Sequence, residues 1–292
     1  MDEAFRIDRQ ALRRSFERAA ATYDAAAVLQ NEVCQRMLAR LDFVKQHPAA
    51  ILDAGCGTGN ALAPLARRYP AARIVALDIA VRMVERARVR IPNWRRLLGR
   101  SVPAVLCADI ECLPLATASC DMIWSNLALQ WADDPARVFA EMHRVLAPGG
   151  LLMFSTFGPD TLKELRTAYD GIDRHVHVNR FIDMHDLGDM LVHHGLGDPV
   201  MDMEQITLTY SNARHLMRDL KAIGAHNLLR GRHTGLSGKH AFARVEQRYE
   251  TFRRDGSLPA TFEVVYGHAW KPQPRRAPSG RPVIEIKPEK RS

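Results

Sequence analysis

Hydrophobic and polar positions divide the chain into two parts with different periodicities. Over residues 10–45, apolar side chains such as Leu12, Phe16 and Tyr23 recur at helical spacing, which predicts helices. From about residue 48 onward, short apolar runs alternate with longer amphipathic segments. Strands that alternate with helices are typical of βαβ units and a parallel sheet. The pattern therefore predicts an N-terminal helical segment, residues 1–47, followed by a doubly wound α/β core.

The predicted strands and helices of the core follow one another in regular order. The strands are expected at 50–54, 73–78, 104–108, 121–125, 151–156, 200–210 and 260–270. The helices are expected at 59–68, from 79 to about 90, and at 135–146, 160–169 and 184–194. Right-handed crossovers place the carboxyl ends of parallel strands at one edge, where such folds bind ligands. A functional site is therefore expected at that edge.

About fifty residues separate the last two predicted strands. If the strand that ends near residue 210 is parallel to the others, this insertion begins at the ligand-binding edge and covers the site. The predicted organisation is thus a core over 48–210, a helical lid over 211–258 and a last core strand over 259–270. The remaining tail, 271–292, contains five prolines and is predicted to be disordered.

The positive charge of the chain is concentrated in its last third. The formal net charge is +8, yet residues 211–258 hold ten Lys/Arg against four Asp/Glu, and residues 271–292 hold seven against two. The rest of the chain has 24 basic and 27 acidic residues. A polyanionic partner would explain this asymmetry, and a merely solvated surface would explain it as well.

The clearest chemical motif joins the first predicted strand to the helix after it and reads LDAGCGTG over residues 52–59. Gly55, Gly57 and Gly59 allow the backbone to approach a ligand closely, and the helix amino terminus adds unpaired N–H groups. The spacing differs from the G-x-G-x-x-G of dinucleotide sites. It suits the amino acid end of S-adenosylmethionine, with Asp53 placed to hold the ammonium group.

Further candidate cofactor residues follow the next strands. Asp78 ends the second predicted strand, where a carboxylate accepts hydrogen bonds from ribose hydroxyls or caps a helix. Asp109, next to Ile110, follows the third strand, where its carboxylate could accept a hydrogen bond from the amino group of adenine. Met83 is expected on the adenine face or in the core. Asn126 is expected in the loop after the fourth strand, near cofactor and substrate, as a residue that shapes the loop.

Other chemistries find little support in the sequence. There is no G-K-[ST] phosphate loop and no G-x-S-x-G nucleophile motif. Five scattered cysteines predict free thiols, and no histidine has a metal-ligand spacing, so no metal is expected. No apolar run approaches the roughly 20 residues of a membrane span. The N-terminus has the pattern of neither a secretory signal nor a transit peptide, so a cytoplasmic protein without a membrane partner is expected.

Five segments carry a resemblance to one family. They read SFERAAATYD (15–24), SNLALQW (125–131), FGPDTLKEL (157–165), KAIGA (221–225) and YGHAW (266–270). Together they resemble the malonyl-acyl-carrier-protein O-methyltransferases of biotin synthesis, over about residues 10–270. The resemblance implies the class I methyltransferase fold, a Rossmann-like, seven-stranded, mostly parallel sheet with helices on both faces and an antiparallel last strand. It also implies S-adenosylmethionine as the cofactor.

The implied reaction is methyl transfer to the free carboxylate of a malonyl group on acyl carrier protein, or on coenzyme A, early in pimeloyl and biotin synthesis. A malonyl carboxylate is already ionised at neutral pH, so no general base is required. Alignment of the reacting atoms and exclusion of water would carry catalysis. Tyr23 would close over the methyl group as the catalytic residue, unless it is a core aromatic of its helix.

The basic insertion has a concrete partner under this resemblance, because acyl carrier proteins are acidic. Long-range attraction between opposite charges speeds the encounter of two proteins. Arg214 and Lys221 are candidates for holding the malonyl carboxylate. The candidates for attracting the carrier are Arg218, Arg230, Arg232 and Lys239.

Three other functions remain open from the sequence. Assembly factors of mitochondrial respiratory complex I, which are linked to arginine hydroxylation, share the Leu-x-Trp and Thr-Leu-x-Glu-Leu patterns. A small-molecule methyltransferase would share the cofactor loop but would not need a large basic lid. A nucleic-acid-binding module would use the basic segments, but the chain lacks a clustered aromatic and basic motif for bases. No nucleic-acid partner is therefore expected.

Overall fold

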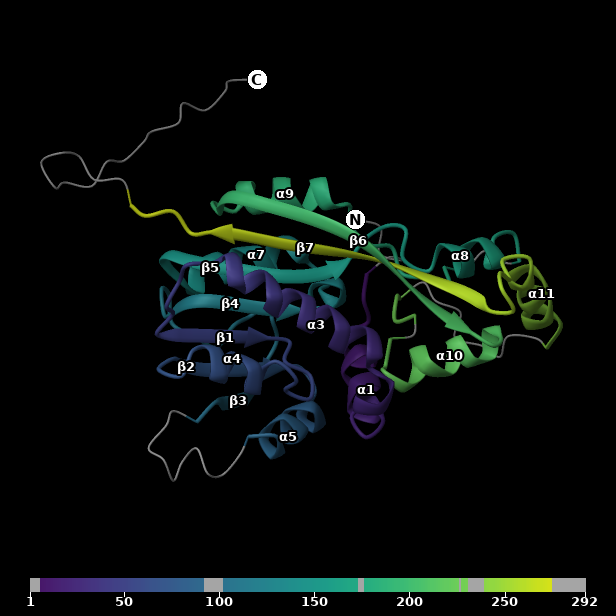
Figure 1. Cartoon of the computed structure of the whole chain (residues 1–292), viewed down its shortest axis with the longest axis horizontal. Coiled ribbons are helices and arrows are strands. Elements are labelled where there is room, and N and C mark those ends of the chain that lie inside the picture. Colours follow the sequence, from purple (N-terminus) through teal and green to yellow (C-terminus); the bar gives the residue numbers. More distant parts are fainter. Residues whose placement is uncertain (1–5, 92–101, 173–175, 226, 231–238, 275–292) are drawn as a thin grey trace, which may run out of the picture.

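The central sheet has the strand order β3-β2-β1-β4-β5-β7-β6 (Figure 1). It belongs to a computed structural model in which residues 6–91, 102–172, 176–225, 227–230 and 239–274 are described. The strands are β1 (Ala50–Ala54), β2 (Arg73–Asp78), β3 (Ala104–Cys107), β4 (Cys120–Asn126), β5 (Leu146–Phe157), β6 (Gly197–Tyr210) and β7 (Leu258–Trp270). The predicted seven-stranded α/β fold is confirmed.

The directions of the strands show where the insertion begins. Neighbours from β3 to β5 pair in parallel, whereas β7 pairs antiparallel with both β5 and β6. The last strand is therefore antiparallel, as predicted. Because β5 and β6 both oppose β7, β6 runs in the same direction as the parallel strands. Its final residue, Tyr210, thus lies toward the edge that holds the carboxyl ends of β1 to β5, and the insertion begins there.

Helices cover both faces of the sheet, because the side chains of a strand alternate between its two faces. On β1, Ile51 packs in the cluster with α3, α4 and α5, whereas Leu52 packs in the cluster with α7 and α9. The helices of the described residues are α1 (Arg9–Ala19), α2 (Tyr23–Ala26), α3 (Val28–Arg40), α4 (Leu62–Arg68), α5 (Val81–Val89), α7 (Pro135–Val145), α8 (Lys163–Tyr169), α9 (Met184–His193), α10 (Ala213–Ala222) and α11 (Lys239–Glu250). The 3₁₀ helices η2 (Leu41–Phe43) and η3 (Leu129–Trp131) complete them.

Some element boundaries differ from the prediction for local reasons. Helix α4 begins at Leu62 rather than at residue 59, because the glycine turn continues through Gly59, whose φ is 84°. Helix α8 begins at Lys163 rather than at residue 160, because Leu162 has a φ of 56°, in the left-handed region. Strand β5 begins at Leu146, five residues before the predicted start, and so includes the Pro-Gly-Gly of residues 148–150.

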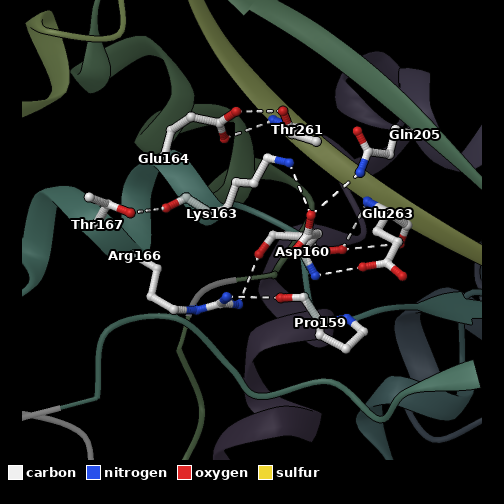
Figure 2. Close-up of polar contacts among 10 residues, drawn as sticks. Pro159, Asp160, Lys163, Glu164, Arg166, Thr167, Gln205, Thr261 and Glu263 are labelled. Carbon is white, nitrogen blue, oxygen red and sulfur yellow. Dashed lines mark hydrogen bonds and ion pairs between the residues drawn. The ribbon is translucent and has the colours of Figure 1, made fainter.

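A cluster of polar contacts joins the start of α8 to β7 (Figure 2). The buried carboxylate of Glu164 accepts hydrogen bonds from the backbone amide (3.1 Å) and the hydroxyl (2.5 Å) of Thr261. The buried carboxylate of Glu263 accepts one from the amide of Asp160 (2.6 Å). Buried polar groups that are well bonded hold a single arrangement. The FGPDTLKEL segment therefore fixes α8 to the last strand.

The described part of the insertion consists mainly of α10 and α11. They lie with α8 at the end of the molecule where β6 and β7 project past the other strands (Figure 1). Helix α11 packs on α8, and α10 contacts α2. Arg214 of α10 pairs with Glu246 of α11 at 2.7 Å. Tyr249 of α11 is fully buried and donates to the carbonyl of Pro259 at 2.8 Å. These contacts hold the described helices of the insertion against the core.

Cysteines, metal ligands and apolar helices give three further observations. The five cysteines are free thiols, as predicted. Within the described ranges, no group of three or more His, Cys, Asp or Glu side chains is arranged to hold a metal ion. No helix in the same ranges is long and apolar enough to cross a membrane. Residues 275–292, most of the predicted disordered tail, lie outside the described residues.

Candidate active site

The turn between β1 and α4 lies at the carboxyl edge of the sheet. Gly55 has a φ of 83°, in the left-handed region, and a Cβ there would lie 2.3 Å from the Cβ of Ala128. Gly59 has a φ of 84°, and a Cβ there would lie 2.9 Å from the Cβ of Ala87. Both positions require glycine for conformation and for space. The glycine turn is therefore packed directly against the loop after β4 and against α5.

Asp78 ends β2 beside this turn. Its Oδ2 accepts a hydrogen bond from the amide of Gly57 (3.0 Å), and its Oδ1 accepts one from the amide of Ala80 (2.9 Å). Burial raises the pKa of Asp78 to about 6, although the backbone hydrogen bonds act in the opposite direction. The carboxylate thus connects the glycine turn to the start of α5, as a residue that caps a helix would. It also lines a cavity.

Asp53 lies on β1 directly before the glycine turn and is 1% exposed. Burial raises its pKa to about 7, and the negative charge of Asp78 adds to the rise. Its Oδ2 has no hydrogen-bond partner among the described residues. A buried oxygen left without a donor is unfavourable. This atom is therefore suited to accept a hydrogen bond from a bound ligand.

A cavity of about 80 Å³, which we call the glycine-loop cavity, opens beside the turn. Eight of the predicted site residues line it, namely Tyr23, Gly55, Gly57, Asp78, Met83, Asp109, Ile110 and Asn126. Asp53 and Gly59 lie at the two ends of the turn but do not line the cavity. The walls thus come from the ends of β1, β2, β3 and β4, at the edge where ligands bind in such sheets.

The N-terminal helices close the outer side of the glycine-loop cavity. Asp24 accepts a hydrogen bond from the hydroxyl of Thr58, in the glycine turn, at 2.6 Å. Glu17 of α1 accepts bonds from the amides of Val81 (2.8 Å) and Arg82 (3.1 Å) at the start of α5. A carboxylate at a helix amino terminus is electrostatically favourable. These contacts hold the segment before β1 across the edge of the sheet that carries the glycine turn.

Tyr23 lies in this N-terminal wall and lines the cavity. A Cβ added to Gly57 would lie 3.9 Å from the Cε1 of Tyr23, so the ring packs over the turn. The ring also packs against an apolar cluster that contains Met83. Burial raises the pKa of the Tyr23 hydroxyl, and the charges of Asp78 and Asp24 add to the rise. The phenol therefore stays neutral at any physiological pH.

Arg9 of α1 also lines the glycine-loop cavity, and the sequence interpretation missed it. Its guanidinium forms ion pairs with Asp109 and, at 2.7 Å, with Glu111. Asp109 also accepts a hydrogen bond from the amide of Glu111 at 2.9 Å. The candidate adenine-binding carboxylate is therefore paired with a cation from the N-terminal wall.

Asn126 is the last residue of β4, and both the nitrogen and the oxygen of its carboxamide form hydrogen bonds. Its Nδ2 donates to the backbone carbonyl of Gln30 at 3.1 Å, and its Oδ1 accepts from the hydroxyl of Ser155 at 2.9 Å. The same hydroxyl oxygen accepts from the amide of Leu127 at 3.0 Å. Asn126 thus links α3 to the ends of β4 and β5, which agrees with a residue that shapes the loop.

A second cavity, of about 300 Å³, lies beneath the insertion, and we call it the lid cavity. Most of its lining is apolar or aromatic and includes Leu162, Leu165, Phe181, Leu208, Met217 and Leu220. The polar side chains in its walls include those of His177, Asn179, Asp219 and Asn227. Lysine and arginine are absent from its lining over the described ranges. Such a site recognises its ligand mainly by shape and a few polar contacts.

The two cavities meet at one place, which we call the junction. It consists of the five residues that line both cavities, namely Gln30, Trp131, Phe157, Ile223 and Ala225. Trp131 packs edge-on against Phe16 of α1, with ring centroids 5.4 Å apart. The two cavities therefore share a largely apolar boundary.

The lid cavity also borders an open basin at the surface. Tyr169, Val176, His177, Val178 and Phe181 line both. The rings of Tyr169 and His177 are stacked, with centroids 3.9 Å apart. The lid cavity and the basin therefore share this aromatic pair in their walls.

The candidate substrate cations of α10 do not line either cavity. Arg214, Arg218 and Lys221 are exposed on the surface of α10. Arg214 is engaged by Glu246 and also lies over the ring of Phe242, with its Cζ 5.0 Å from the ring centroid. The structure therefore places these three cations around the site and not inside it.

The other basic candidates lie further along the insertion. Arg230 is exposed, and its backbone amide donates to the carbonyl of Arg6 at 2.9 Å, next to the N-terminal helices. Arg232 lies outside the described residues, as does the side chain of Lys239. The assignment of these residues to the carrier stays a prediction.

Several cavity residues were not predicted from the sequence. Trp131 stands in the SNLALQW segment, so the resemblance pointed near it without giving it a role. Gln30 lies seven residues after Tyr23 in a predicted helix, and this helical spacing was the available signal. His177 and Asp219 come from separate segments that meet only in the folded chain, so no spacing in the sequence indicated them.

Comparisons with known proteins agree with this geometry. Residues 52–154 match the model of a methyltransferase domain family. A malonyl-[acyl-carrier protein] O-methyltransferase of Gallionella capsiferriformans is 57% identical, over 96% of this chain and 97% of that relative. One of Laribacter hongkongensis is 56% identical, over 99% of each. The solved structure of the YcgJ protein from Bacillus subtilis has a TM-score of 0.57 at 15% identity, covering 82% of this chain and 99% of that one, which shows the fold.

The sheet order, the glycine turn and the matched domain define a methyltransferase with the class I fold. Within this class, identity over nearly the whole chain decides the family. The chain belongs to the malonyl-[acyl-carrier protein] O-methyltransferase family. The complex I assembly factor and the small-molecule methyltransferase are therefore not the favoured interpretations.

Proposed function

We propose that this protein transfers a methyl group from S-adenosylmethionine to the free carboxylate of malonyl-acyl carrier protein. The observation that carries the proposal is the pair of cavities that meet at the junction, one beside the glycine turn and one enclosed by the lid. The family membership supports the same reaction. By this proposal the product enters the synthesis of the pimeloyl precursor of biotin.

The glycine-loop cavity fits the proposed cofactor. Asp78 faces the cavity with a carboxylate suited to ribose hydroxyls. The unpartnered Oδ2 of Asp53, at the base of the turn, suits the ammonium group. Met83 and Ile110 offer apolar surfaces on which an adenine ring can lie. When bound, the cofactor supplies an electrophilic methyl group on a sulfonium ion.

A carboxylate acceptor needs no general base, because it is already ionised at neutral pH. A carboxylate oxygen forms a bond to the methyl carbon while the carbon–sulfur bond breaks and leaves its electron pair on sulfur. No proton moves, and both products are neutral at the reacting atoms. The chain therefore has to align the two groups and exclude water. Trp131 and Phe157 form an apolar junction for this purpose, and Tyr23 closes the outer side.

The lid cavity and the basin suit an acyl group on a long arm. The malonyl thioester would lie in the lid cavity, and its arm would leave past Tyr169 and His177 into the basin. An acidic carrier protein would then dock over this end of the molecule. Exposed cations there, such as Arg180 in the basin and Arg218 on α10, favour its approach.

The assay that tests the proposal compares malonyl-acyl carrier protein with acetyl-acyl carrier protein in the presence of methyl-labelled cofactor. Label should appear on the malonyl form alone, because the acetyl form has no free carboxylate. Equal labelling of both carriers, or of neither, would refute the proposal. Malonyl-coenzyme A assayed in parallel separates recognition of the malonyl group from recognition of the carrier.

A further inference from the structure

Gln30 is the third residue of α3 and lies at the junction, where it lines both cavities. Three of the five junction residues, Phe157, Ile223 and Ala225, have purely apolar side chains. The polar side-chain groups at this boundary therefore belong to Gln30 and Trp131. Of the two, only a carboxamide can both donate and accept a hydrogen bond.

Gln30 is partly buried, and its carboxamide oxygen is incompletely bonded. Its Oε1 is buried and has no hydrogen-bond partner among the described residues. The residue itself is well fixed, because its backbone carbonyl accepts the 3.1 Å hydrogen bond from Asn126. Because the unpartnered atom is an acceptor, the missing contact must come from a donor, such as the C–H groups of a methyl group on a sulfonium ion.

The charges around the lid cavity indicate which end of it a carboxylate would occupy. Asp219 lines the cavity from α10, and its carboxylate is hydrogen-bonded to the Tyr210 hydroxyl. A second carboxylate placed there would meet a like charge. Gln30 instead lies at the junction, in the first turn of α3, where backbone N–H groups give a partial positive charge. A malonyl carboxylate is therefore better placed beside Gln30.

We propose that the carboxamide of Gln30 positions the malonyl carboxylate at the junction; this inference rests on the proposed function. Its NH₂ group donates to the carboxylate oxygen that does not attack. Its carbonyl oxygen then faces the methyl group, where a weak C–H···O contact is favourable. A neutral donor orients the carboxylate without stabilising its charge as strongly as a cation would. Since that charge disappears during the reaction, a tightly bound cation would favour the ground state.

Two substitutions test this role. In Gln30→Leu both polar groups are lost, and we expect the KM for malonyl-acyl carrier protein to rise about tenfold, while the Kd of the cofactor changes less than about threefold. Gln30→Glu introduces a like charge, so at about pH 8 the KM should rise more than in Gln30→Leu. As the pH falls toward about 6, protonation of the buried Glu restores a neutral donor and acceptor, and the KM should return toward the wild-type value.

Gln46 provides a matched control. Its Oε1 is also buried without a partner, and its Nε2 donates to the carbonyls of Asp121 (3.0 Å) and Gly149 (3.5 Å). It lines neither cavity. Gln46→Leu should therefore lower the melting temperature without changing KM or kcat.

The outcomes separate this inference from the proposed function. If the wild-type protein does not methylate malonyl-acyl carrier protein, the proposed function itself fails. If it does, two results overturn the role of Gln30. One is an unchanged KM in both variants, and the other is a loss confined to cofactor affinity with no recovery of Gln30→Glu at low pH.

Discussion

The two cavities are built in different ways. The inner wall of the glycine-loop cavity consists of short turns at the ends of strands, where backbone hydrogen bonds fix polar groups such as Asp78, and the N-terminal helices close its outer side. The lid cavity has walls from α8, α10, β6 and the segment around residues 176–181, and these walls are mainly apolar. The difference agrees with the proposed function, in which the parallel core would bind the methyl donor and the added elements would select the acceptor.

This division predicts that the two cavities can be altered separately. Mutational effects at sites without shared partners usually add. Changes in the glycine-loop cavity should therefore act on cofactor affinity, and changes in the lid cavity should act on KM for the acceptor. The junction lies between the two cavities, and there we expect Gln30 to act mainly on the acceptor.

The largest effect is expected from Asp78→Ala. It removes the carboxylate that bonds Gly57 and Ala80 and that is proposed to bind the ribose. We expect cofactor affinity to fall about 10- to 100-fold, the scale for lost hydrogen bonds to a charged group. Calorimetric titration with the cofactor measures this. A normal Kd would exclude a role in binding, and Asp78→Asn, which keeps one acceptor, should lie between the two.

Met217→Trp should show the opposite pattern. Met217 is partly buried on α10 and lines the lid cavity, which a larger ring would fill. The kcat/KM for malonyl-acyl carrier protein should fall about tenfold, while cofactor affinity stays unchanged. Steady-state kinetics with calorimetry checks both numbers. Val192→Trp, on the exposed side of α9, is the control and should change neither. If Met217→Trp lost cofactor affinity by as much as it lost kcat/KM, the proposal that the two cavities act separately would be wrong.

The pH dependence of cofactor binding tests Asp53. Its pKa is raised to about 7 in the ligand-free protein, and a cationic ammonium would bind the ionised form. Affinity should therefore fall about threefold between pH 7.5 and pH 6.5, as protonation competes with binding. In Asp53→Asn this slope should disappear and binding at pH 7.5 should be weaker. An identical slope in the variant would assign the titration to another group.

The stability of the ligand-free protein provides a second test of Asp53. Its dependence on pH should be opposite to that of cofactor affinity. The folded-state pKa of Asp53 lies above the ordinary value for aspartate. The group therefore favours folding at low pH, and this contribution is lost as the pH rises through about 7. Ligand-free Asp53→Asn should consequently be more stable than the wild type at pH 8, with a difference that shrinks toward pH 5. Thermal unfolding at several pH values measures this.

The smallest effect is expected from Arg218→Glu on the exposed face of α10. It reverses a charge outside both cavities, so it should slow association with the acidic carrier about twofold at low salt. The kcat/KM for malonyl-coenzyme A should hardly change, which makes that substrate the internal control. An equal loss with both substrates would place Arg218 in the chemistry of the site.

Much of the core could be predicted from the sequence, because its signals are local. The apolar run of β1, the turn at Gly55 and the carboxylate at Asp78 lie within 30 residues of one another. Strand periodicity and the requirement for glycine therefore indicated both the fold and one wall of the site. The antiparallel last strand came from the resemblance and is confirmed.

The lid cavity could not be predicted in the same way. Its walls come from segments that are distant in the chain, and their apolar side chains look like ordinary core residues in the sequence. The basic charge of the insertion drew attention to Arg214 and Lys221, yet side chains on the outer face of a helix remain in solvent. Gln30 could not be recognised as a site residue from the sequence, because a polar residue in a predicted helix is normally exposed.

The most direct test of the account is the mass of the acyl group released from malonyl-acyl carrier protein after incubation with the protein and unlabelled S-adenosylmethionine. The account predicts a gain of one CH₂ unit on the malonyl fragment, which mild alkaline hydrolysis of the ester removes. An unchanged malonyl fragment, or a methyl group found on the carrier polypeptide instead, would contradict it.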